Sequence, residues 1–183
     1  MNIGMVSEEY VTSVYQSSEL MANGLSPMTC DYAWYRLSCG LGEDWCLSDS
    51  PQKLFSHGDG IEILPAWSLS QLLSVMPEAI CLDEYGRCNL MLGKDRVGEG
   101  FKGCDKIDWT VCYINKKGFV FDSHTCSRLL DALVLMLIRI LSMNLFSHLK
   151  YTDSIVDKKY KDITESIVGH DKEFHDEVMH LKF

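Results

Sequence analysis

The chain has 183 residues, of which 46% are hydrophobic and 23% are charged, and its formal net charge at pH 7 is −9. This length suits one domain with its own core, and the composition excludes a long disordered protein. The acidic balance excludes a general nucleic-acid binder, because neutralising phosphates requires clusters of Lys and Arg. The only adjacent basic pairs are Lys116-Lys117 and Lys158-Lys159, so we expect no nucleic-acid partner.

The eight cysteines predict free thiols in a reducing compartment. The N-terminal stretch Met1 to Tyr10 does not have a basic region followed by an apolar core, and a chain of this size needs no disulfides. The cysteine spacing never gives the close pair of zinc sites or redox motifs. His170, His175 and His180 fall about 140° apart on a helix and cannot converge on one metal without another segment. We therefore expect a cytoplasmic protein without metal or cofactor.

The first third of the chain predicts a helix followed by a strand. Residues Ser7 to Asn23 form an amphipathic pattern, with Ser7 as the N-cap and Gly24 as the stop. Residues 31–37 alternate and are rich in aromatic side chains, which is typical of a strand. Residues 40–49 predict a loop or hairpin, and residues 51–60 predict irregular structure.

The clearest local signal lies between Leu64 and Pro77. Ser68 is a natural N-cap, Gln71 stands at the capping-box position, and Pro77 marks the exit. This pattern predicts a short helix over residues 69–76, packed on a sheet.

The middle of the chain predicts a set of antiparallel strands. They are expected at residues 79–82, 88–92, 109–114 and 119–122. The last two pair through the turn Asn115 to Gly118, in which a glycine can take a positive φ. Residues 93–108 are rich in glycine and charge and predict a loop, where binding sites concentrate.

Residues Arg128 to Met143 are almost entirely apolar and keep one thin polar stripe at helical spacing, formed by Arg128, Asp131, Arg139 and Ser142. A helix of this kind must be covered by other elements on nearly every side. Its charged residues argue against a membrane span, because a charge near the bilayer centre costs about 3 kcal/mol. We expect a buried core helix and no membrane partner.

These elements predict an α+β fold in two parts. Residues 1–146 form a globular domain in which a small antiparallel sheet is covered by two or three helices. Residues 147–183 form a C-terminal helical extension, with a half-apolar face over a charged background. The extension packs on the domain or on a second subunit, which gives a route to a homodimer.

The order of these signals resembles a group of small proteins encoded by gut bacteria, their mobile elements and their phages. The resemblance spans roughly residues 17–144, and its most specific part is the Pro-Ala-Trp-Ser-Leu element at residues 65–69. It lends no activity or site, but it implies an accessory protein rather than a housekeeping enzyme. The strand, strand, helix order is also similar to antitoxin-like domains, in a generic way.

Asp122, His124 and Cys126 form the catalytic candidate. On a continuing strand they share one face, and an imidazole beside a thiol can hold it as a thiolate for nucleophilic attack. The segment 123–127 is equally typical of a polar junction that caps the next helix. The enzyme hypothesis is therefore the alternative: a small cysteine-dependent hydrolase or transferase.

The binding candidates come from two loops. Trp45 stands beside Glu43 and Asp44 in a predicted loop, and Lys94, Arg96 and Phe101 lie in the glycine-rich segment. With no convincing reactive cluster and an acidic surface, we favour a non-catalytic interaction protein. Its partner is expected to be a protein, in the setting of a phage or mobile element that acts on a host protein.

Overall fold

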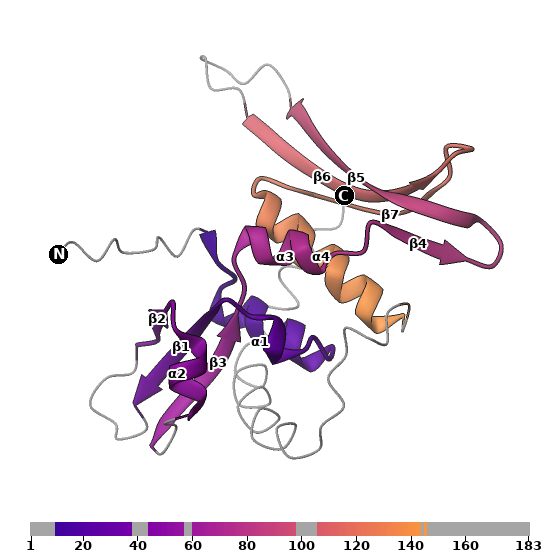
Figure 1. The fold of residues 1–183 in the computed structure, drawn as a ribbon. Helices are drawn as coiled ribbons and strands as arrows, with labels where there is room; N and C mark the ends of the chain where they lie inside the picture. Colours follow the sequence, from indigo (N-terminus) through magenta and orange to yellow (C-terminus); the bar gives the residue numbers. More distant parts are fainter. Residues whose placement is uncertain (1–9, 38–43, 57–59, 98–105, 144, 146–183) are drawn as a thin grey trace.

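The computed structural model describes residues 10–37, 44–56, 60–97, 106–143 and 145. They form an α+β fold with two antiparallel sheets, where the sequence predicted one. The four-stranded sheet lies at the top of Figure 1 with α4 beneath it, and the three-stranded sheet lies at the opposite end. The predicted extension at residues 147–183 lies outside the described residues.

The three-stranded sheet has the order β2-β1-β3. It consists of β1 (Tyr32–Leu37), β2 (Cys46–Ser48) and β3 (Ile61–Ala66). The aromatic strand predicted at residues 31–37 is confirmed, and so is the hairpin around Trp45. The sequence did not predict β3, because Pro65 stands within it; an edge strand tolerates a proline whose missing N–H faces away from the ladder.

Three short helical elements accompany this sheet: α1 (Val14–Ala22), the 3-10 turn η2 (Pro27–Thr29) and α2 (Pro51–Ser56). The predicted N-cap Ser7 lies outside the described residues, and the described helix begins later than expected, after a capping box formed by Ser13 and Gln16. Thr12 instead bonds to the backbone of Trp67. The prediction of irregular structure from residue 51 is also wrong over α2.

The four-stranded sheet has the order β4-β5-β6-β7. It consists of β4 (Ala79–Leu82), β5 (Gly86–Val97), β6 (Lys106–Asn115) and β7 (Val120–Cys126). The predicted strands and the Asn115 turn are confirmed, and Gly118 has a φ of 82°. The loop predicted at residues 93–108 is wrong at both ends, because β5 and β6 pair as far as Val97 and Lys106.

Two helices complete the core: α3 (Leu69–Val75), with Ser68 as its N-cap, and α4 (Leu129–Ser142). Helix α4 packs on β6 and β7 and also contacts α1 and α3. Its predicted burial is confirmed, although Leu135 is 43% exposed. Arg128 occupies the N-cap position without a side-chain capping bond, so the polar segment before α4 does not cap it.

Candidate functional site

Strand β7 carries the predicted catalytic residues on the face that meets α4. His124 pairs in register with the buried Val111, and its Nε2 lies 3.8 Å from Asp122 Oδ1. Asp122 Oδ2 accepts a hydrogen bond of 2.9 Å from Arg139 Nε on α4. The carboxylate therefore pairs with a cation of the core helix.

The surroundings of His124 and Cys126 favour the neutral imidazole and the protonated thiol. Burial lowers the pKa of His124; Asp122 opposes this shift and Arg139 adds to it. Burial, together with the nearby Asp131 carboxylate, raises the pKa of the Cys126 thiol. Cysteine nucleophiles need a thiolate, which an adjacent imidazolium stabilises. The pKa shifts of His124 and Cys126 favour a neutral imidazole and a protonated thiol instead, which is unfavourable to the alternative enzyme hypothesis.

A thiol alkylation time course tests this conclusion. We expect iodoacetamide to modify Cys126 more slowly than the exposed Cys81 and Cys46 between about pH 6 and pH 9, because only the thiolate reacts. Peptide mass spectrometry gives the rate at each cysteine. If Cys126 were the fastest of the described thiols below about pH 8, the non-catalytic interpretation would be wrong.

The predicted binding residues do not form one site. Trp45 is half-buried against the core of the three-stranded sheet, and the Arg36 guanidinium lies 4.8 Å from its ring centroid. Lys94 belongs to the other sheet, where its Nζ lies 5.2 Å from the ring centroid of Trp109. Arg96 lies within β5, and Phe101 lies outside the described residues.

The four-stranded sheet has one covered and one uncovered face. Side chains alternate along its strands, and those on the inner face, such as Val111 and Tyr113, are buried against α4. Figure 1 shows no described helix on the outer face. Met91 and Val120 stand there with exposed fractions of 51% and 44%. The strand register places beside them Asn89, Thr110, Cys112, Ile114, Ser123 and Thr125.

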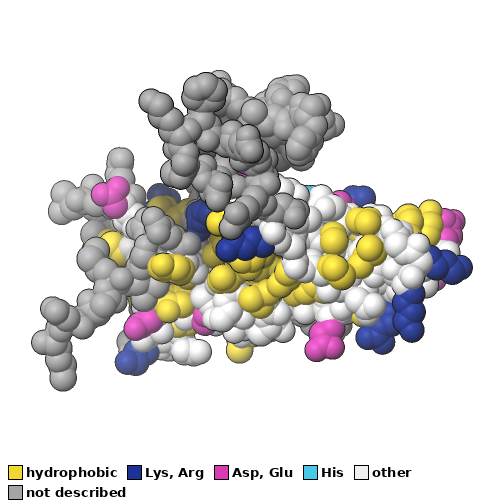
Figure 2. All heavy atoms as spheres, turned by 90° about the horizontal axis from the view of Figure 1, so that it is seen from above, with side chains coloured by type: hydrophobic (Ala, Val, Ile, Leu, Met, Phe, Trp, Pro, Cys, Tyr) yellow, Lys and Arg dark blue, Asp and Glu magenta, His cyan; other side chains and the backbone are white. Residues whose placement is uncertain are grey.

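This outer face carries apolar and uncharged polar side chains along its length, and charged side chains stand at one end. Figure 2 views it from above: hydrophobic side chains run along it, and Lys and Arg stand at the right-hand end together with Asp or Glu side chains. Thr110 Oγ1 and Thr125 Oγ1 share a hydrogen bond of 2.9 Å across β6 and β7, so the two hydroxyl groups satisfy each other. The face therefore offers hydrophobic contact area with few charges to desolvate.

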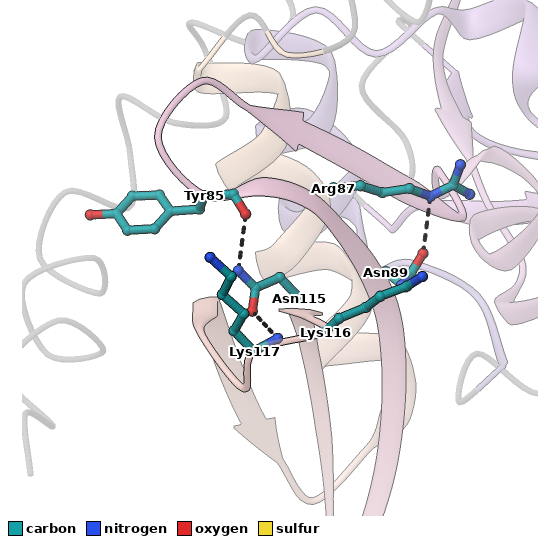
Figure 3. Close-up of a pocket in the computed structure, with 6 residues that line it drawn as sticks. All are labelled: Tyr85, Arg87, Asn89, Asn115, Lys116 and Lys117. Carbon is teal, nitrogen blue, oxygen red and sulfur yellow. Dashed lines mark hydrogen bonds between the residues drawn. The ribbon is translucent and has the colours of Figure 1, made fainter.

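An open depression of about 550 Å³ lies near the turns that join β4 to β5 and β6 to β7. It is lined by Tyr85, Arg87, Asn89, Asn115, Lys116 and Lys117 (Figure 3). Three of the six are cations, and no acidic side chain lines it. Within the described part of the chain, none of these cations forms a salt bridge.

Asn115 joins the two turns around the depression. Its Nδ2 donates to the Tyr85 carbonyl at 2.9 Å, and its Oδ1 accepts from the backbone N–H groups of Lys117 and Phe119 at 2.9 and 3.0 Å. The rings of Tyr85 and Phe119 stack with centroids 3.7 Å apart. The turns are thus held together by both polar and aromatic contacts.

The sequence contained only part of this site. The Lys116-Lys117 pair was visible in the sequence as two adjacent basic residues, but Arg87 precedes it by almost thirty residues and carried no signal of its own. What brings them together is the pairing of β5 with β6, in which Cys88 lies opposite Asn115. The length of β5, which pairs with β6 as far as Asn115, is therefore what places Arg87 beside the lysine turn.

No protein-family model matches the chain, and neither the curated proteins nor the solved structures give a significant match. None of the helices formed by the described residues has the length and apolar character needed to cross a bilayer. The same residues contain no cluster of three or more His, Cys, Asp or Glu side chains suited to a metal ion.

Proposed function

We propose that this protein is a non-catalytic interaction protein that binds a partner protein through the outer face of its four-stranded sheet. The observation that carries the proposal is the exposure of Met91 and Val120 on a sheet face that no described helix covers. Contiguous exposed apolar surface of this kind marks interaction sites, because leaving it in water costs free energy.

The size of the face supports a partner of protein dimensions. Strands of 4, 12, 10 and 7 residues, about 4.8 Å apart and rising about 3.4 Å per residue, cover roughly 500 Å². Each side of a standard protein–protein interface contributes about 800 Å². The face therefore provides the centre of such an interface, with flanking loops as its rim.

We also propose that the protein acts in the setting of a phage or mobile element. The Pro-Ala-Trp-Ser-Leu element at residues 65–69 supports an accessory protein of a phage or mobile element that acts on a host protein. The six described cysteines are all free, which supports a reducing compartment such as the cytoplasm. A homodimer through the predicted helices of residues 147–183 remains part of the proposal.

A charge placed on the face tests its role. We expect Met91→Glu to lose a protein that the wild type captures in stoichiometric amounts from a gut-bacterial lysate, because the carboxylate would have to be desolvated in the interface. Once identified and purified, that protein should bind Met91→Glu at least about a hundredfold more weakly in a titration.

Met28→Glu is the matched control, because Met28 is 82% exposed and lies on η2, away from the four-stranded sheet. This variant should bind the partner as the wild type does. Light scattering of the purified protein identifies the case in which the partner is a second copy. Equal capture by wild type and Met91→Glu, or capture of nothing from the wild type, would overturn the proposal.

A further inference from the structure

We propose that the depression between the two sheet turns is a binding site for a phosphoryl group, with Arg87, Lys116 and Lys117 as its cationic ligands. This inference stands apart from the proposed function, because a small anion can bind here whether or not the apolar face has a partner. Its basis is a concentration of positive charge on a chain that carries 26 acidic and 17 basic residues.

The cations at this site are not neutralised by the described protein. Arg87 donates through Nε to Asn89 Oδ1 at 3.2 Å, which fixes the side chain and leaves its terminal N–H groups for a ligand. Lys116 and Lys117 are both exposed and form no salt bridge with described residues. Such a guanidinium fork with two ammonium groups matches the oxygens of a phosphoryl dianion.

The backbone that carries these cations is held in place before a ligand arrives. The Asn115 side chain ties the lysine turn to the Tyr85 carbonyl, and the Tyr85–Phe119 stack reinforces that contact. In Figure 3 the Lys116 side chain extends toward Asn89 and Arg87, while the Tyr85 ring points away from them. The backbone of the two turns therefore loses little conformational entropy when a ligand binds, which favours affinity.

The dimensions indicate how much of a ligand fits. The space of about 550 Å³ exceeds one phosphate ion and lies within the usual range of small-molecule pockets. The lining offers three positive charges and the free Nδ2 end of the Asn89 amide beside the apolar parts of its side chains. The chemistry thus selects the phosphoryl group itself, on a free metabolite or on a phosphorylated side chain.

Titration calorimetry at low salt tests the site with two probes. We expect saturable one-to-one binding of inorganic pyrophosphate, of a phosphoserine peptide, or of both. The double variant Lys116→Gln/Lys117→Gln should weaken binding roughly a hundredfold, and Arg87→Gln roughly tenfold, because each removes charge-assisted hydrogen bonds. Preference for pyrophosphate indicates a free ligand, and preference for the phosphopeptide over its unphosphorylated form indicates a modified protein.

Lys53→Gln is the matched control, because it removes one positive charge from the exposed surface of α2 and leaves the sheet turns unchanged. It should bind the probes as the wild type does. The absence of saturable binding by either probe would overturn the inference. So would equal affinity of the wild type and the double lysine variant, since that result means an adventitious charge effect.

Discussion

Replacing Trp67 by alanine is expected to lower the free energy of unfolding by about 4 kcal/mol, because this side chain is fully buried in the main core. Its Nε1 donates a hydrogen bond of 2.9 Å to Thr29 Oγ1. The substitution therefore leaves a large cavity and removes this hydrogen bond, while Thr29 Oγ1 still donates to the Ser26 carbonyl at 2.7 Å. Urea denaturation followed by far-UV circular dichroism measures the loss without relying on tryptophan fluorescence.

Trp67 also stands between the two sheets. It follows β3 directly and precedes α3, and its backbone N–H and carbonyl both bond to Thr12. The variant Trp45→Ala is the control, because Trp45 is only partly buried and packs on the smaller cluster. It should lose roughly half as much stability. Equal losses for the two variants would contradict the placement of Trp67 at the centre of the core.

Local signals predicted the elements whose residues determine their own conformation. The α3 helix was predictable because Ser68 accepts a hydrogen bond from the Gln71 backbone N–H, which its sequence position indicates directly. The hairpin at Asn115 was predictable for a similar reason, since Gly118 takes a positive φ there. The apolar character of α4 was enough to predict its burial.

Elements stabilised by distant partners were not predictable in the same way. Strand β3 includes Pro65 and forms only because β1 pairs with it along its whole length. The ends of β5 and β6 looked like a loop, since their composition is rich in glycine and charge. Their ladder extends to Val97 and Lys106 because each strand supplies the other's hydrogen bonds.

The same distinction applies to the candidate sites. Alternation placed Asp122, His124 and Cys126 on one face correctly, but it could not reveal that this face meets α4 and that burial keeps the thiol protonated. Arg87 lies beside the lysine pair because of the register between β5 and β6. Met91 is exposed because α4 packs on the other face of the four-stranded sheet and no described helix covers the face of Met91. Such contacts depend on tertiary structure, which residue spacing does not contain.

Replacing Leu137 by alanine is expected to lower the free energy of unfolding by about 3 kcal/mol, because this side chain is fully buried where α4 meets the rest of the core. Leu135→Ala is the matched control: it makes the same chemical change in the same helix, at a side chain that is 43% exposed. Both variants alter helix propensity equally, so the difference between them isolates burial. Chemical denaturation should show a loss below about 1 kcal/mol for Leu135→Ala, and similar losses for the two variants would mean that α4 is not enclosed as described.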